Sequence, residues 1–403
     1  MALLGRRSPD PCPARSGTGD TSARGAPGNG VSRLVGPGPE LIRPALDGLI
    51  PYEPGKPAET VQRELGLERV VKLASNEGPF GPFPEALEAI AKALPDSNRY
   101  PDGGCFRLRD ALSRRHGVAF EEIVVAAGAD AVIGFACQAT LDVGDEIVTP
   151  WPSFPSYVLD PLKLGAVPVR IPLRDGRVDA EAILSAVTER TKLAFLPTVN
   201  NPTGTMTPRD DMLGFLDAVP DHVLTVVDEA YFEYVEDPDF PDAIEEAAKQ
   251  GRHVLALRTF SKIYGLAGLR VGYGVGPAPL IEAIHKVRRA FDVATPGQEA
   301  ALASLDAPAE LARRRAANRE SMEALEAVLR GGGFEPLGPA VGNFLFVDVG
   351  TDAAALYDAL LRRGVIVRPM GSFGAPTALR ITAGTAEEIA FLAEQLGDVF
   401  SNS

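Results

Sequence analysis

The segment 258–273, RTFSKIYGLAGLRVGY, places reactive side chains in an apolar part of the chain. Lys262 follows the hydroxyl of Ser261, and Arg270 comes after a run of small and glycine residues. A lysine amine at the end of a strand can form a Schiff base with an aldehyde cofactor. Hydroxyls, backbone amides and an arginine can hold a phosphate ester. The alternative for this segment alone is a strand and a turn whose charges face solvent.

Polar residues also follow three other apolar runs. The sequence Gly-Ala-Asp, ending at Ala129 and Asp130, opens a helix whose N-terminal N–H groups favour an anion such as phosphate. Asn201 precedes a Pro-Thr-Gly turn, and Asp228 and Tyr231 follow the run HVLTVV. Each has a structural explanation when taken alone, as a helix start, a turn or an N-cap. Ligands of an open parallel sheet bind beyond the carboxyl ends of its strands, and a buried carboxylate can keep a pyridinium nitrogen protonated. Together these residues predict a pyridoxal 5′-phosphate site.

The elements that must position these residues alternate along the chain from about residue 85. Short runs rich in Val, Ile and Leu predict strands, and most are separated by helical stretches such as 83–94, 179–189 and 208–219. The predicted strands lie near 123–130, 145–150, 167–173, 192–198, 222–230, 253–260 and 269–276. This alternation predicts an α/β fold with a mostly parallel, doubly wound sheet.

The regular alternation of predicted strands and helices ends after about residue 296. A long helical region at 308–333 precedes an apolar run at 343–349, a helix at 352–363, runs at 365–369 and 378–382, and a final helix near 385–399. We therefore expect a large domain over 76–295 and a smaller α+β domain over 296–403. An N-terminal arm, 40–75, is expected to pack with the small domain. Residues 1–39, rich in Gly, Pro, Ser and Arg, predict a disordered tail.

The composition of the chain limits the kinds of partner that it is expected to bind. The chain has 403 residues, 45% of them hydrophobic, and a formal net charge of −14, which disfavours a nucleic acid or an anionic membrane as partner. Apolar runs are shorter than the roughly 18–20 residues that a membrane span needs. Three cysteines without ligand spacing indicate a reducing compartment, the cytoplasm, and four scattered histidines predict no metal site.

These motifs resemble those of the fold-type I, class I/II aminotransferases, and most closely the histidinol-phosphate aminotransferase family. The resemblance covers about residues 41–400. It rests on PYEPGKP, KLASNEGPFGP, RYPDGG, GAD, NNPTG, VVDEAY, TFSKIYGLAGLRVGY, GNFLFV and VRPMGSFGAPTALRITAGT.

The resemblance implies a role for each candidate residue. Lys262 would form the Schiff base and move the proton, Asp228 would pair with the pyridine nitrogen, and Phe154 would stack on the ring. The ring hydroxyl would bind Asn201 and Tyr231. The remaining implied cofactor contacts hold the phosphate: Ala129, Asp130, Thr259, Ser261, Arg270 and, from the partner subunit of a homodimer, the residue equivalent to Tyr100.

The resemblance also implies a substrate. Histidinol phosphate would donate its amino group to 2-oxoglutarate, with Tyr52, Asn343, Arg368 and Arg380 as the substrate contacts. The alternative for the two arginines is a surface ion pair at strand ends. Three positions depart from the family pattern and concern the substrate end of the pocket: Gly78, Ala131 and Asp292.

Other functions stay open. An aromatic amino-acid (phenylalanine/tyrosine) aminotransferase is favoured by the departures and by Trp151, Phe154 and Phe373. A threonine-phosphate decarboxylase-like enzyme is a further alternative. A cofactor-binding regulator without catalysis is the alternative outside the enzymes, and the joint presence of Lys262 and Asp228 favours catalysis over it.

Overall fold

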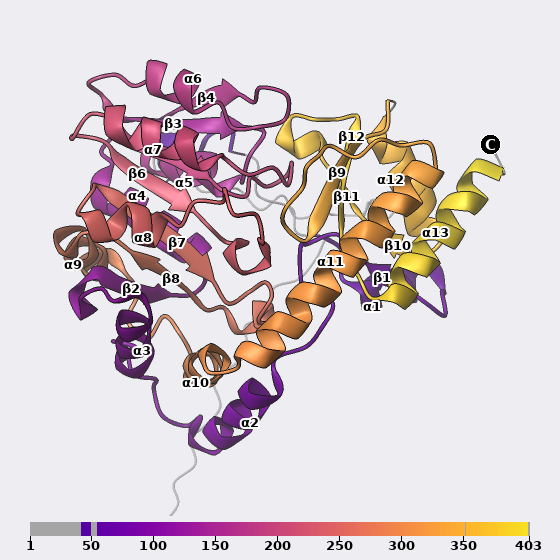
Figure 1. The fold of residues 1–403 in the computed structure, drawn as a ribbon, viewed down its shortest axis with the longest axis horizontal. Coiled ribbons are helices and arrows are strands. Elements are labelled where there is room, and N and C mark those ends of the chain that lie inside the picture. The colour runs from indigo at the N-terminus through magenta and orange to yellow at the C-terminus, as the bar shows by residue number, and fades with distance from the viewer. Residues whose placement is uncertain (1–41, 50–54, 351, 402–403) are drawn as a thin grey trace, which may run out of the picture. The chain divides into compact units, whose positions relative to one another are not determined.

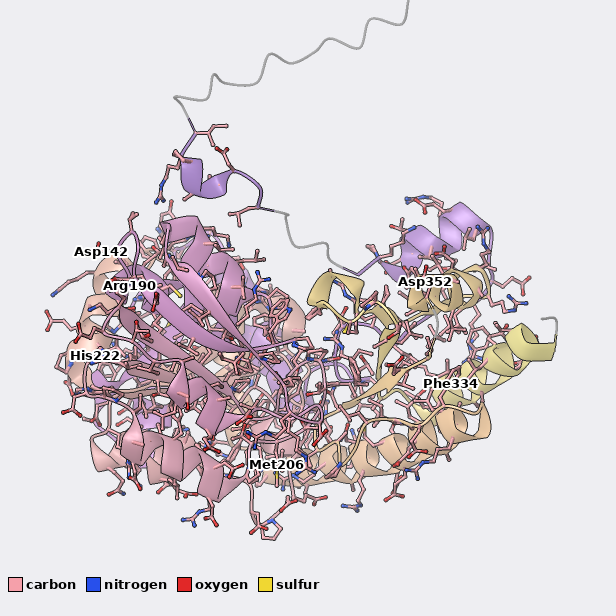
Figure 2. The ribbon with its side chains drawn as sticks, turned by 90° about the horizontal axis from the view of Figure 1, so that it is seen from above. Asp142, Arg190, Met206, His222, Phe334 and Asp352 are labelled. Carbon is pink, nitrogen blue, oxygen red and sulfur yellow. The ribbon has the colours of Figure 1, made fainter. Side chains whose placement is uncertain are left out.

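A computed structural model describes residues 42–49, 55–350 and 352–401 (Figure 1). Ala45–Ser403 forms one compact unit. Two parts of this unit are marked in Figure 2 by His222, near a seven-stranded sheet, and by Phe334, near two small sheets.

The seven-stranded sheet has the order β2-β8-β7-β6-β5-β3-β4. Only β8 runs antiparallel to its neighbours, and the other neighbouring pairs in this sheet are parallel. The strands are β2 (Ile123–Ala126), β3 (Glu146–Trp151), β4 (Val167–Pro172), β5 (Thr191–Pro197), β6 (Leu224–Asp228), β7 (Val254–Thr259) and β8 (Gly272–Val275). Most of their residues are buried because helices cover both faces.

Two hydrophobic clusters fill the space on either side of this sheet. One lies under α4 (Ala129–Thr140), α5 (Ser156–Leu164) and α9 (Ala278–Val287). The other lies under the remaining helices of this part. These are α2 (Pro84–Ala93), α3 (Phe106–His116), α6 (Ala180–Ser185), α7 (Arg209–Ala218), α8 (Ala243–Glu246) and α10 (Thr295–Leu305). The predicted doubly wound, mostly parallel sheet is confirmed.

The rest of the unit contains two small sheets. A parallel pair joins β1 (Val71–Lys72) to β10 (Val365–Ile366). An antiparallel sheet has the order β11-β12-β9, from Arg368–Pro369, Ala378–Thr382 and Phe344–Asp348. A third hydrophobic cluster packs these strands against α11 (Pro308–Gly331), α12 (Ala353–Arg362) and α13 (Ala386–Ser401), and α1 (Ala58–Leu65) lies beside a fourth.

The expected strand at 365–369 is divided in the structure. Val365 and Ile366 pair with β1, whereas Arg368 and Pro369 pair with β12. One apolar run therefore contributes a strand to each of two sheets.

The division into a large and a small domain stays a prediction. The structure adds that α10 packs on α2 and α3 and that β1 pairs with β10. The predicted tail, 1–39, and Tyr52 lie outside the described residues.

Candidate active site

The carboxyl ends of the parallel strands surround one cavity. Ten of the eleven predicted cofactor contacts line it, all except Tyr100. The ten are Ala129, Asp130, Phe154, Asn201, Asp228, Tyr231, Thr259, Ser261, Lys262 and Arg270, and the lining also includes Ile133, Tyr157, Val199 and Ala230. Residues from Ala129 to Arg270 thus meet at the carboxyl ends of the parallel strands, as the topology requires.

Asp228 is the last residue of β6 and is buried. Its Oδ2 accepts a hydrogen bond of 2.6 Å from the Tyr157 hydroxyl, and its Oδ1 accepts one of 3.0 Å from the Ala230 N–H. Burial raises the pKa of this carboxyl, while the bonds from Tyr157 and Ala230 and the positive charge of Lys262 lower it. Asp228 is therefore a carboxylate that gains from a cationic partner inside the cavity.

Lys262 lies just beyond the end of β7. Its Nζ lies 5.3 Å from the centre of the Tyr231 ring. Burial and the positive charge of Arg380 lower the pKa of its amine from 10.5 to about 8, although Glu77 and Asp228 oppose the shift. A lysine with this pKa is partly neutral near physiological pH, as a nucleophilic amine must be.

The N-terminus of α4 and Arg270 form a cradle. Gly128 precedes α4 with φ +93°, and a Cβ there would lie 2.7 Å from Arg270 Nη2. On the other side, a Cβ at Gly272 would lie 2.2 Å from the Ala129 nitrogen. Both glycines are therefore required for this close approach.

Arg270 is held in an unusual backbone conformation, with φ +54°. Its guanidinium donates to Ser261 Oγ at 3.5 Å, to the Ala267 carbonyl at 3.2 Å and to the Ala127 carbonyl at 3.4 Å. The cradle thus joins the helix N–H groups of Ala129 and Asp130 to a guanidinium and a hydroxyl. These donors fit a phosphate group.

Tyr231 is fixed by a residue that the sequence analysis did not assign, Asn76. The Asn76 amide donates a bond of 2.9 Å to the Tyr231 hydroxyl. Asn76 is itself buried, has φ +53°, and exchanges bonds with the Thr382 hydroxyl through its N–H and its Oδ1. Asn343 Nδ2 donates to the Asn76 carbonyl at 3.3 Å. Asn343, predicted to contact substrate, therefore supports the segment that orients Tyr231.

Arg380 reaches the cavity from β12. Nη1 donates to Asn201 Oδ1, and Nη2 donates to the Ala74 carbonyl at 2.7 Å. The side chain is buried, so Arg380 does not lie at the surface as the alternative of a surface ion pair requires. Arg380 and Asn201, predicted to bind different groups, contact each other in this structure.

Two other predicted residues lie outside the lining of the cavity. Arg368 is half-buried, pairs directly opposite Arg380 in β11–β12, and lies 6.0 Å from the Phe373 ring centre. Residues directly opposite each other share one face of a sheet. Tyr100 is 82% exposed and stacks on Phe291, with ring centres 4.7 Å apart.

The three departures from the family pattern have different surroundings. The Asp292 carboxylate accepts a bond of 2.7 Å from the Ala127 N–H, so it is paired with backbone beside the cradle. A Cβ at Gly78 would lie 3.2 Å from the Lys262 carbonyl. Ala131 is in the first turn of α4 and packs at the edge of its hydrophobic cluster.

Tyr157 was not assigned from the sequence either. It lies three residues after Phe154 in the motif WPSFPSY, and its ring stacks on Phe195 at 4.6 Å. A tyrosine near the end of a predicted strand was the available signal, but its bond to Asp228 crosses from α5 to β6 and depends on the strand order.

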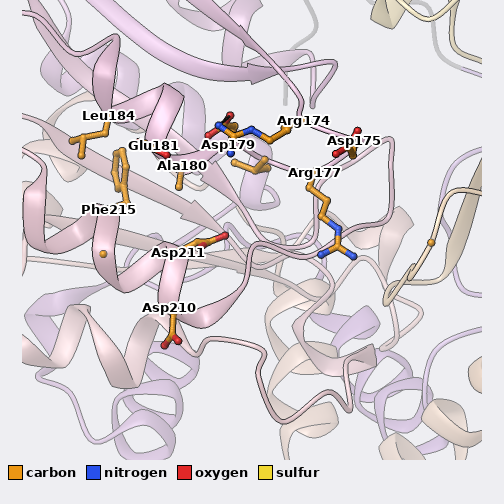
Figure 3. Close-up of a pocket in the computed structure, with 13 residues that line it drawn as sticks. Arg174, Asp175, Arg177, Asp179, Ala180, Glu181, Leu184, Asp210, Asp211 and Phe215 are labelled. Carbon is orange, nitrogen blue, oxygen red and sulfur yellow. Dashed lines mark ion pairs between the residues drawn. The ribbon is translucent and has the colours of Figure 1, made fainter.

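A larger hollow of about 710 Å³ lies elsewhere in the structure (Figure 3). It is open and lined by side chains of both charges, including Arg174, Arg177, Asp210 and Asp211. Arg174 pairs with Asp179 at its rim. Its lining contains none of the residues predicted to do chemistry, so we place the candidate site in the smaller cavity.

The residues 42–49, 55–350 and 352–401 offer neither a metal site nor a membrane span. There, no group of three or more His, Cys, Asp or Glu side chains is arranged to hold a metal ion. Within the same ranges, no helix has both the length and the apolar character needed to cross a bilayer.

Comparison with known proteins gives consistent matches. Residues 68–396 match the family model described as aminotransferase class I and II. The chain is 42% identical over 355 residues to histidinol-phosphate aminotransferase 2 of Methylococcus capsulatus, covering 87% of this chain and 95% of that protein. It is 43% identical over 354 residues to the histidinol-phosphate aminotransferase of Akkermansia muciniphila, covering 87% and 96%.

A solved structure agrees with these matches. The histidinol-phosphate aminotransferase of Sinorhizobium meliloti, in complex with pyridoxal 5′-phosphate, superposes with a TM-score of 0.83 and 30% identity, covering 90% of this chain and 98% of that one. The similarity extends over both the seven-stranded sheet and the small sheets, since so little of either chain is left out. The chain belongs to the class I and II aminotransferase family.

Proposed function

We propose that this chain is a pyridoxal 5′-phosphate-dependent aminotransferase that transfers the amino group of histidinol phosphate to 2-oxoglutarate, in histidine biosynthesis. The products are imidazole acetol phosphate and glutamate. One observation carries the proposal: Lys262, Asp228 and Arg270 line one cavity in a chain whose relatives are named for this activity.

The cavity offers a partner for each part of the cofactor. Bound pyridoxal phosphate supplies an aldehyde that links to an amine and a ring that acts as an electron sink. The Asp228 carboxylate holds the proton on the ring nitrogen, and Phe154 packs against the ring face. Asn201 and Tyr231 bind the ring hydroxyl. The phosphate is held by the cradle residues: Ala129, Asp130, Thr259, Ser261 and Arg270.

Lys262 is the group that makes and breaks covalent links. Its neutral amine would condense with the cofactor's aldehyde with loss of water, and once freed by a substrate amine it would hold the proton that leaves or returns to the substrate α-carbon. The lowered pKa supports this assignment, because an amine near pKa 8 both accepts and releases a proton at neutral pH.

We assign substrate binding to Arg380, together with Arg368, Asn343 and Tyr52. Histidinol phosphate carries a phosphate and 2-oxoglutarate carries two carboxylates, so both half-reactions require an anion-binding arginine. Arg380 supports this role because it is buried beside Asn201 at the cavity.

We further propose that the protein acts as a homodimer in the cytoplasm. Exposed Tyr100, stacked on Phe291, supports a surface that reaches a second copy and its cofactor phosphate. Three cysteines, of which Cys105 and Cys137 are free and buried, support a reducing compartment.

The test is a single-turnover titration of the cofactor-loaded protein. Histidinol phosphate, phenylalanine and histidinol are added separately, and loss of the cofactor's absorption band is followed. Rapid bleaching by histidinol phosphate alone supports the proposal. A preference for phenylalanine would assign the chain to the aromatic enzymes, with Arg380 as a carboxylate ligand.

The control variant is Lys262→Ala. We expect it to lose the covalently linked absorption band and at least about 10³-fold in turnover, because no other amine replaces the nucleophile. Normal turnover in this variant would refute the mechanism.

A further inference from the structure

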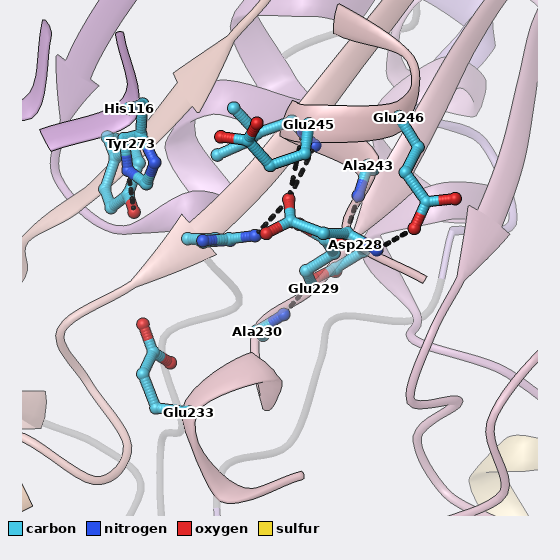
Figure 4. Close-up of polar contacts among 12 residues, drawn as sticks. His116, Asp228, Glu229, Ala230, Glu233, Ala243, Glu245, Glu246 and Tyr273 are labelled. Atoms are coloured by element: carbon cyan, nitrogen blue, oxygen red, sulfur yellow. Dashed lines mark hydrogen bonds and ion pairs between the residues drawn. The ribbon is translucent and has the colours of Figure 1, made fainter. Parts of the chain in front are cut away.

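A group of charges that the chemistry above does not use begins at the residue after Asp228, with Glu229 and Arg258 buried and Asp242 partly exposed (Figure 4). Glu229 follows Asp228 directly, and its side chain is fully buried. One carboxylate oxygen accepts a bond of 2.7 Å from the Ala243 N–H, and the other accepts one of 3.0 Å from Arg258 Nε. Both oxygens are therefore engaged in directed bonds.

Arg258, in β7, connects Glu229, which follows β6, to the start of α8. Its Nη2 donates to Asp242 Oδ1 at 2.8 Å, and its guanidinium carbon lies 3.4 Å from the Phe232 ring centre. Asp242 in turn accepts bonds from Ile244 N–H and Glu245 N–H at the start of α8. A guanidinium with two separate carboxylate partners cannot be replaced by a lysine, which lacks the planar fork.

The position of these charges along the strands is what relates them to the cavity. β6 and β7 are parallel neighbours, with Asp228 opposite Leu257. Successive strand residues point to opposite faces, so Asp228 faces the cavity while Glu229 faces the charges behind it. In β7, Arg258 immediately precedes Thr259, which lines the cavity, and Lys262 follows shortly after.

We infer that Glu229, Arg258 and Asp242 form a positioning unit that fixes the carboxyl end of β6 against that of β7, and so sets the Asp228 carboxylate relative to the Lys262 amine. The inference rests on the proposed function, because it concerns how these two groups hold the cofactor. None of the three residues lines the cavity, so they act through Asp228 and Lys262.

The arrangement of donors and acceptors gives a sharp variant. Glu229 faces two donors, the Ala243 N–H and Arg258 Nε. In Glu229→Gln, the amide oxygen can accept from only one of them, and the NH2 group then faces the other donor. Arg258→Lys keeps the charge but cannot bond Glu229 and Asp242 in the same geometry. Both variants should therefore loosen the two strand ends in the same way.

A control variant comes from the amino end of a strand in the same sheet, opposite the carboxyl ends that surround the cavity. Glu146 is the first residue of β3, is buried, and accepts bonds from Thr188 Oγ1 at 2.5 Å and Arg190 Nε at 3.0 Å. Glu146→Gln makes the same chemical change at a buried carboxylate that lies away from the cavity and whose arginine partner is 70% exposed.

The experiment compares the wild type with these three variants as full chains. Pyridoxal phosphate affinity is measured on the cofactor-free protein by fluorescence quenching, at a temperature at which circular dichroism shows each variant folded. The pH dependence of the bound cofactor's absorbance is the second readout. For Glu229→Gln and Arg258→Lys we expect about tenfold weaker binding of pyridoxal phosphate and a shift in the pH midpoint of the cofactor's absorbance change. Small displacements of the groups that contact the cofactor weaken their interactions with it. Glu146→Gln should match the wild type in both.

Each result decides between the possibilities. Wild-type-like affinity and titration in both test variants would overturn the inference. So would unfolding of both while Glu146→Gln stays folded, since the cluster would then be structural only. If only one test variant folds, the folded variant carries the test. If the wild type itself fails to bind pyridoxal phosphate, the proposed function fails instead.

Discussion

At the scale of single residues, the pKa of Lys262 has a measurable consequence. Burial and Arg380 lower it from 10.5 to about 8, so the amine is half neutral near pH 8 and nearly all neutral about one pH unit higher. We predict that cofactor-free protein captures pyridoxal phosphate faster as pH rises from about 6 to about 9, and that the rate then levels off. Stopped-flow absorbance measures this rate.

The variant Arg380→Met tests the cause. Removing the second-largest contribution to the shift should raise the pKa of Lys262 and move the plateau to higher pH. An unchanged pH profile in this variant would show that Arg380 does not contribute to the shift.

Tyr157 supports a second prediction at this scale. Its hydroxyl bond lowers the pKa of Asp228, so Tyr157→Phe should raise that pKa. A hydrogen bond to a charged group contributes about 1.5–3 kcal/mol, so turnover should fall by about tenfold or more. Because Asp228 must be ionised, the acid limb of the pH–rate profile should move to higher pH. Equal profiles for the variant and the wild type would contradict this role.

Residues that belong to sequence motifs were easier to predict than residues that act across elements. Lys262, Asp228 and Arg270 follow apolar runs in recognisable patterns, and all three line the cavity. Tyr157 and Asn76 were missed because each contacts its partner from a distant element. Their roles depend on which strands are neighbours and on the close approach of β12, which periodicity does not reveal.

At the scale of elements, the cradle depends on the contact between β8 and the start of α4. A Cβ at Gly272 would lie 2.2 Å from the Ala129 nitrogen, whereas nothing lies within 4 Å of one at Gly268 in the same segment. We predict that Gly272→Ala destabilises the protein by about 1–3 kcal/mol and weakens pyridoxal phosphate binding. Gly268→Ala, the control, should leave binding unchanged. Thermal unfolding and cofactor titration measure the two effects, and equal behaviour of the variants would refute the contact's importance.

The predicted strands of the large sheet correspond closely to the observed ones because buried parallel strands read as continuous apolar runs. The edge strand β4 has the same kind of sequence, yet its residues are only half-buried or exposed. The run 365–369 was predicted as one strand and serves two sheets, because the change of partner at Val367 leaves no trace in composition.

At the scale of the whole molecule, the exposed aromatic pair predicts association. Tyr100 is 82% and Phe291 47% exposed, and such apolar surface is usually covered in an assembly. We predict twice the mass of one chain in solution, and a lower dimer affinity for Phe291→Asp, since Asp tolerates the φ of +57° at this position but carries a charge. Sedimentation equilibrium measures the mass. A monomeric wild type would contradict the homodimer.

Strand order is the part of the whole molecule that the sequence leaves open. The alternation of strands and helices predicts a parallel sheet, but β8 lies between β2 and β7 and runs antiparallel to both.

The pairing of β1 with β10 has a consequence for how the protein is made. Val71 pairs with Val365, and the Ala74 carbonyl accepts a bond from Arg380, so two of the contacts that hold the segment before Asn76 are made by residues 365–380. Nascent chains fold from the N-terminus as they emerge. The strands that precede Asp228 and Lys262 lie earlier in the chain and can pair before these contacts form. A nascent chain that has not yet reached residue 365 therefore lacks both the partner of β1 and Arg380.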